Sequence, residues 1–74
     1  MKLNNINNQK DLIVKKINIE DNELKSFLFS LGLYEGEQIA IIKKKKYDCI
    51  VSIKGAKYAL DENICKSIEV EELC

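Results

Sequence analysis

The chain has 74 residues, of which 46% are hydrophobic and 32% are charged, with twelve basic and twelve acidic side chains and a formal net charge of zero. This composition is typical of one small folded domain over residues 1–74 and excludes a disordered chain. A neutral balance also argues against a dedicated nucleic-acid binder, whose surface usually carries a basic excess.

Cysteine usage and hydropathy indicate the compartment. Cys49, Cys65 and Cys74 are odd in number and widely spaced, a pattern typical of free thiols in a reducing compartment. The first residues lack the apolar region of a signal peptide, and apolar runs stay well below the roughly 18 residues that span a membrane. We expect a cytoplasmic protein that does not span the membrane.

The first part of the chain predicts a loose start, a strand and a helix. Residues 1–9 are polar and rich in asparagine. Residues 11–20 are rich in β-branched residues and favour a half-buried strand, with Ile13, Ile17 and Ile19 on one parity. Asp21 or Asn22 is a plausible helix N-cap. The buried face of that helix is predicted from the i, i+3, i+4, i+7 pattern of Leu24, Phe27, Leu28 and Leu31.

Glycine is rare in this chain, and each of its three glycines indicates a change of direction. Gly32 follows the helical pattern and predicts a left-handed C-terminal cap. Gly36 predicts a turn into an aliphatic strand over residues 37–43, and Gly55 predicts a turn after a second strand over residues 49–54. These two strands should form a hairpin whose tip carries a run of four basic residues, Lys43, Lys44, Lys45 and Lys46.

The last third predicts a short strand after Gly55, one helical turn capped by Asp61 and a final strand with Ile68 and Val70 on one parity. The whole order predicts a mostly β protein, a small barrel of about five strands with one inserted helix, since closure leaves few exposed sheet edges.

Residues that could carry chemistry are few. The chain has no histidine, no phosphate-binding loop and no acid pair in a setting that would shift its pKa, so we expect no enzyme. The cysteines can be read as core thiols or as metal ligands. Because none stands in a CxxC pair, we expect core thiols and no metal or cofactor site.

Two surfaces could bind a partner. The lysine run is either a solvated tip or a contact for an anionic membrane or an acidic patch. Phe29 lies off the predicted helix stripe, so it is either exposed for a partner, with Leu33 and Tyr34 extending the same surface, or buried by strands on both sides of the helix.

The block LFSLGL (residues 28–33), Gly36, the Gly55 turn, Ala59 and Leu60, and the closing residues 68–70 resemble the FeoA family. The resemblance covers residues 13–72. FeoA proteins are small cytoplasmic accessory proteins of bacterial ferrous iron uptake, and the resemblance implies an SH3-like β-barrel. It also implies a partner, FeoB, a membrane transporter with a cytoplasmic GTP-binding domain that could hold the protein at the membrane.

The chain departs from the family pattern at three places. Glu35 stands where proline is usual, Phe27 where a basic residue is frequent, and lysines replace the proline and glycine of the hairpin. Two alternative functions remain open. One is a stand-alone SH3-like domain of the iron-dependent repressor type that modulates a transcription regulator. The other is a nucleic-acid-binding barrel, which the neutral charge and five aromatic residues disfavour.

Overall fold

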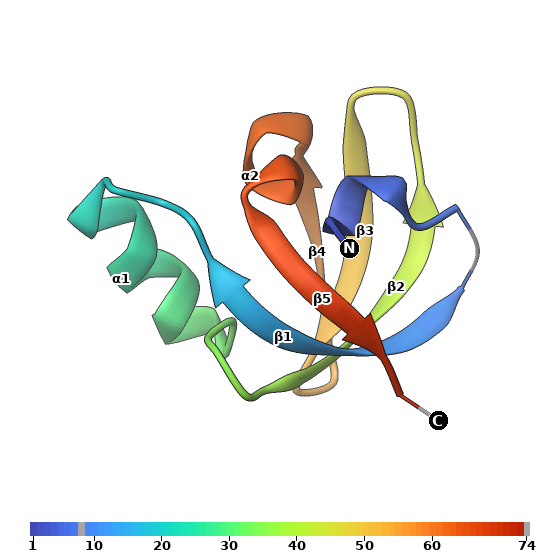
Figure 1. Ribbon diagram of the computed structural model, residues 1–74, viewed down its shortest axis with the longest axis horizontal. Coiled ribbons are helices and arrows are strands. Elements are labelled where there is room, and N and C mark those ends of the chain that lie inside the picture. Colours follow the sequence, from blue (N-terminus) through green and yellow to red (C-terminus); the bar gives the residue numbers. More distant parts are fainter. Residues whose placement is uncertain (8, 74) are drawn as a thin grey trace.

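The computed structural model describes residues 1–7 and 9–73 (Figure 1). In chain order the elements are η1 Leu3–Asn5, β1 Lys10–Ile17, α1 Asn22–Leu31, β2 Gln38–Lys44, β3 Asp48–Ile53, β4 Ala56–Asp61, α2 Glu62–Lys66 and β5 Ile68–Glu72. The predicted helix and strands are all present, and most of their ends lie within one or two residues of the predicted ends.

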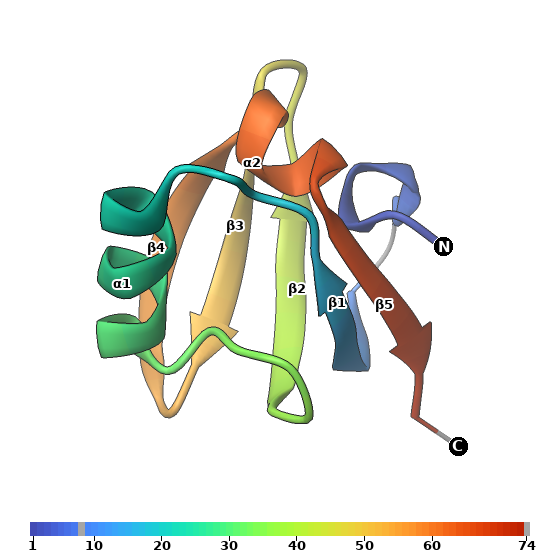
Figure 2. The ribbon, with the colours of Figure 1, turned by 60° about the vertical axis from the view of Figure 1, so that its left-hand side comes forward.

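The five strands form one curved antiparallel sheet in the order β4-β3-β2-β1-β5. Figures 1 and 2 show the sheet wrapping around itself, with α2 over one end and α1 projecting from one side. The prediction of a mostly β, SH3-like fold of five strands with an inserted α-helix is confirmed.

The core lies on the inner face of the curved sheet. Strand β3 shows the reason most simply, because Cys49, Val51 and Ile53 alternate with half-buried residues and point inward. Every side chain of the buried core cluster is hydrophobic: Leu3, Ile6, Leu12, Val14, Leu28, Leu33, Ile39, Ile41, Cys49, Val51, Ile53, Leu60, Cys65, Ile68 and Val70.

The predicted inner face of β1 is partly wrong. Leu12 and Val14 are buried, whereas Ile13 is only half-buried on the opposite face. The pairing of β1 with β5 shifts between Val14 and Lys16, which is a β-bulge. A bulge adds one residue to a strand and so reverses the side-chain alternation beyond it. For this reason Ile17, three residues after Val14, packs partly against the same core.

The expectation of a loose N-terminal segment is also wrong. Leu3 is 0% exposed and Ile6 is 3% exposed, so both side chains belong to the core. The Val70 amide donates to the Met1 carbonyl at 2.7 Å, and the Met1 ammonium donates to the Val70 carbonyl at 3.1 Å. These bonds pair the N-terminus with the edge of β5, which the polar composition of the segment did not indicate.

Helix α1 begins as predicted but buries a narrower face. The Asp21 carboxylate caps it, accepting from the amides of Glu23 and Leu24 at 2.9 and 3.2 Å. Leu28 is buried and two leucines, Leu24 and Leu31, pack partly against the core. Phe27 is 58% exposed, so its predicted place on the buried face is wrong.

Local signals at the other turns are confirmed. Gly36 and Gly55 have positive φ values of 90° and 84°. The Asp61 carboxylate accepts from the Ile64 amide at 2.9 Å and so caps α2. Among the described residues, no helix combines the length and apolar character needed to cross a membrane.

Candidate functional site

The candidate site is built around the end of α1. Gly32 ends the helix in the left-handed conformation, with φ 99° and ψ 11°. The Leu33 amide donates to the Leu28 carbonyl at 2.9 Å, so the chain reverses sharply at this point. The reversal turns Leu33 into the core and brings Tyr34 back beside Phe29.

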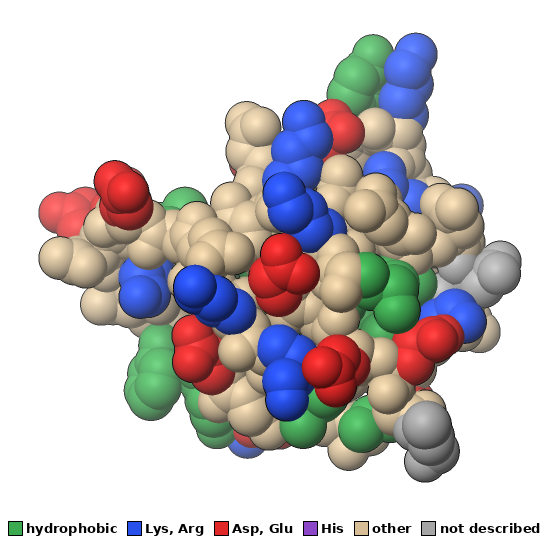
Figure 3. All heavy atoms as spheres, viewed as in Figure 1, with side chains coloured by type: hydrophobic (Ala, Val, Ile, Leu, Met, Phe, Trp, Pro, Cys, Tyr) green, Lys and Arg blue, Asp and Glu red, His purple; other side chains and the backbone are tan. Residues whose placement is uncertain are grey.

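Phe29 and Tyr34 form an aromatic pair on the surface. Their ring centroids are 4.8 Å apart and the rings are tilted by 36°. Phe29 is 62% exposed, which agrees with the exposed reading of its position off the leucine stripe. Figure 3 shows hydrophobic atoms projecting at the lower left, beneath α1. Phe29 is exposed and Tyr34 is half-buried, so the two rings together form an apolar surface at the end of α1.

A groove of about 310 Å³ lies next to this pair. Its lining combines apolar and charged side chains: Ile17, Lys25, Phe29, Leu33, Tyr34 and Glu35. Leu33 departs from the sequence expectation, because its side chain is 1% exposed and contributes to the groove only from the core side. Neither Ile17 nor Lys25 was predicted here, since both reach the groove only through the packing of α1 beside the end of β1.

Tyr34 is held from its other side by an ion pair. The Lys54 ammonium lies 2.8 Å from Glu37 Oε2 and 5.7 Å from the centroid of the Tyr34 ring. The hydrogen bond from Lys54, followed by that from Tyr34, holds the pKa of Glu37 below its ordinary value. The hydrogen bond to Glu37 likewise raises the pKa of Lys54. Both groups therefore stay charged around neutral pH, and the Lys54 ammonium lies near the Tyr34 ring.

The predicted lysine run lies at the far end of the β2–β3 hairpin. Lys43 and Lys44 complete β2, so only Lys45, Lys46 and Tyr47 make up the connection to β3. We call Lys43, Lys44, Lys45, Lys46 and Tyr47 together the lysine tip. Figures 1 and 2 show this tip at the top of the molecule and α1 at its left side, so the structure does not join the two predicted surfaces into one site.

The two described cysteines are core residues. Cys49 and Cys65 are free and both are 0% exposed, and the Cys65 thiol donates to the Leu60 carbonyl at 3.5 Å. Burial, and next the neighbouring Cys49, raises the pKa of the Cys65 thiol. Within residues 1–7 and 9–73, no three His, Cys, Asp or Glu side chains are grouped to hold a metal ion. The third cysteine, Cys74, lies outside the described residues.

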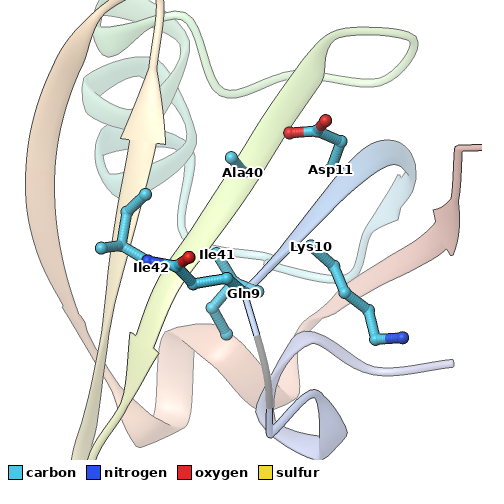
Figure 4. Close-up of a pocket in the computed structure, with 6 residues that line it drawn as sticks. All are labelled: Gln9, Lys10, Asp11, Ala40, Ile41 and Ile42. Atoms are coloured by element: carbon cyan, nitrogen blue, oxygen red, sulfur yellow. The ribbon is translucent and has the colours of Figure 1, made fainter.

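Two further hollows lack convergent chemistry. The hollow of about 340 Å³ beside β1 and β2 has Lys10 and Asp11 pointing in different directions (Figure 4), and the Lys10 ammonium pairs with Glu72. A second hollow of about 430 Å³ lies between the start of α1 and α2. Two of its carboxylates, those of Asp21 and Asp61, are already engaged as helix caps.

Comparison with known proteins shows the family of the chain. The chain matches the FeoA domain family over residues 1–72. None of the curated proteins compared with it is similar at the sequence level.

Solved structures share the fold at low sequence identity. The crystal structure of an iron uptake regulatory protein, FeoA, superposes with a TM-score of 0.86 at 22% identity, over 99% of this chain and 97% of that one. The solution structure of iron(II) transport protein A from Clostridium thermocellum superposes with a TM-score of 0.83 at 23% identity. The match covers 99% of this chain and 46% of that one.

ScaR with bound Zn²⁺ gives a TM-score of 0.85 at 20% identity over 99% of this chain, which covers only 37% of ScaR. These likenesses establish the fold, and the match to the family extends over nearly all of the sequence. The chain belongs to the FeoA domain family, whose members are non-enzymatic accessory domains associated with ferrous iron transport.

Proposed function

We propose that this protein is an accessory protein of bacterial ferrous iron uptake that binds the cytoplasmic GTP-binding domain of a FeoB-type transporter. Membership of the FeoA family supports the pathway. The observation that carries the contact is the exposure of Phe29, which is 62% exposed beside an apolar groove. If strands of this chain covered Phe29, the face would need no partner. Because they do not, most of a large aromatic side chain remains in water.

The Phe29 face has the features of an interface anchor. Binding energy at protein interfaces concentrates in a few aromatic or large side chains that enter well-packed pockets. Phe29 supplies the aromatic ring and the groove beside it can receive an apolar side chain from the partner. Lys25 and Glu35 lie at the same groove and can pair with charges at the rim of such a contact.

The surroundings of Phe29 reduce the entropic cost of binding. Tyr34 stacks against the Phe29 ring at 4.8 Å and is itself held by the Lys54–Glu37 pair. A side chain that is already ordered loses less conformational freedom when a partner covers it. The Phe29 face is therefore a preorganised surface in this proposal, and the transporter domain supplies the apolar complement.

The test is capture of the purified GTP-binding domain of the transporter, with and without guanine nucleotide, by wild type and two matched variants. Phe29→Asp places a charge on the proposed face. Phe27→Asp places the same charge on the same helix at a residue 58% exposed, and two residues along a helix are rotated by about 200°. We expect Phe29→Asp to weaken capture by about 30-fold or more, which corresponds to an anchor of about 2 kcal/mol.

Phe27→Asp should capture the domain nearly as well as wild type. Circular dichroism and the melting temperature show whether each variant is folded. Equal capture by all three proteins would remove the Phe29 face from the interface, and failure of wild type to bind in either nucleotide state would contradict the transporter partner. In that case the regulatory alternative, modulation of a transcription regulator, becomes the function to test.

A further inference from the structure

The lysine tip combines charge with an exposed aromatic ring at the most projecting part of the hairpin. Tyr47 is 68% exposed, the largest exposed fraction among the large hydrophobic side chains in the described part of the chain. The Lys46 ammonium lies 5.3 Å from the centroid of the Tyr47 ring. Figure 3 shows basic and hydrophobic atoms projecting together at the hairpin end, at the upper right.

The backbone of the tip is held at both sides. The Lys45 amide donates to the Asp48 carbonyl at 2.8 Å and closes the turn. The Glu62 amide at the start of α2 donates to the Tyr47 carbonyl at 2.9 Å. The Lys44 ammonium also donates to the Lys45 carbonyl. A tip fixed in this way presents its side chains with little further loss of backbone freedom when it binds.

Charge is unevenly distributed between the tip and the body. Residues 43–48 contain four lysines and one aspartate, so their side chains carry +4 − 1 = +3. The formal net charge of the chain is zero, so the side chains of all other residues together carry −3. Near a negatively charged plane, this separation orients the molecule with the lysine tip forward and the body away from the plane.

We propose that the lysine tip binds the surface of a bilayer that contains anionic lipids. The lysines pair with lipid phosphates, and the Tyr47 ring enters the headgroup region, where an apolar body with a polar hydroxyl is favoured. A planar lipid surface suits this geometry because the Lys46 ammonium lies beside an exposed aromatic ring at a projecting hairpin end. The inference is independent of the proposed transporter contact, which uses the separate surface at the end of α1.

Sedimentation with vesicles of phosphatidylglycerol and phosphatidylcholine, against vesicles of phosphatidylcholine alone, tests the proposal. The tip variant is K43Q/K45Q/K46Q, which leaves the half-buried Lys44 in place. The control is K15Q/K16Q/K57Q, with the same change in net charge at exposed lysines that make no ion pair among the described residues. Neither variant changes the transporter contact, so the two proposals can fail separately.

Each lysine near an anionic surface contributes about five-fold to binding, so the tip variant should bind phosphatidylglycerol vesicles on the order of 100-fold more weakly. The control variant should lose only a few-fold. Wild type should bind phosphatidylcholine vesicles poorly, and raised salt should weaken its binding to the anionic vesicles. Equal losses in the two variants would show a general charge effect and would overturn the proposal.

Insertion of the aromatic ring gives a second readout. The chain contains no tryptophan, so Tyr47→Trp introduces a single tryptophan, whose emission can be excited selectively, at the tip. Its emission should shift to shorter wavelength with phosphatidylglycerol vesicles and stay unchanged with poly-glutamate. No shift with the vesicles would show that the ring stays in water and would overturn the proposal. Equally tight binding of poly-glutamate at the same salt concentration would assign the tip to an acidic protein partner and would also overturn the lipid assignment.

Discussion

Gly32→Ala tests the junction that shapes the candidate site. With φ 99° at this position, an L side chain is strained by about 1–2 kcal/mol. A Cβ atom would also lie 2.9 Å from Lys54 Cδ and Cε and 3.0 Å from Ile53 Cγ2. The Lys54 side chain can move aside, but Ile53 is fully buried and cannot move without disturbing the core.

The two effects together should lower the free energy of unfolding of Gly32→Ala by about 2–4 kcal/mol, taking about 1–2 kcal/mol for the crowded core contact. For a domain of this size, 1 kcal/mol shifts the melting temperature by about 4–8 °C. Urea unfolding followed by circular dichroism measures the loss.

Gly55→Ala is the matched control. Gly55 has φ 84°, but a Cβ atom there would meet nothing within 4 Å. It should therefore show the backbone strain alone, about 1–2 kcal/mol. If Gly32→Ala and Gly55→Ala lose the same stability, the crowding against Ile53 is unimportant. If neither loses stability, the reasoning from backbone strain is refuted.

Three further predictions follow from the buried N-terminus, the ion pair and the thiols. Leu3→Ala should lower the free energy of unfolding by about 2–5 kcal/mol, because Leu3 is 0% exposed, and an unchanged urea midpoint would contradict its place in the core. Because the folded-state pKa of Glu37 is lowered, the stability difference between wild type and Glu37→Gln should be constant near neutral pH and disappear as pH falls below about 4. A difference that grew on acidification would contradict the pairing with Lys54. In a variant whose C-terminal cysteine is replaced by serine, Cys49 and Cys65 should resist a thiol reagent in the native state and react in urea, because both are buried. Rapid reaction of the native protein would contradict this expectation and would show that α2 opens easily.

The sequence by itself determined the features that depend on neighbours a few residues apart. The cap at Asp61, the left-handed end of α1 at Gly32 and the turn at Gly36 all agree with the structure, and of the two predicted caps of α1, Asp21 and Asn22, the structure has Asp21. Each depends on a local requirement, either a side-chain oxygen for a free amide or a residue without Cβ, so residue type and spacing are sufficient to predict it. The alternation of Ile68 and Val70 was equally readable, because β5 contains no bulge between them.

Only the tertiary structure decided which faces are buried. Leu12 and Val14, and not the predicted Ile13, lie on the inner face of β1. The reason is that long-range pairing with β5 sets the register of the strand and includes a bulge. Met1 pairs with the edge of β5, and the side chain of Leu3 packs into the core. Nothing in the polar N-terminal segment itself indicates that edge.

The candidate site was decided in the same way. A helical wheel places Phe29 off the leucine stripe, but it cannot say whether strands cover that side of the helix. The structure brings only a narrow stripe of α1 against the sheet, so both Phe27 and Phe29 stay exposed while Leu33, adjacent to Gly32, enters the core. Burial depends on contacts between segments far apart in the chain, and local patterns do not contain that information.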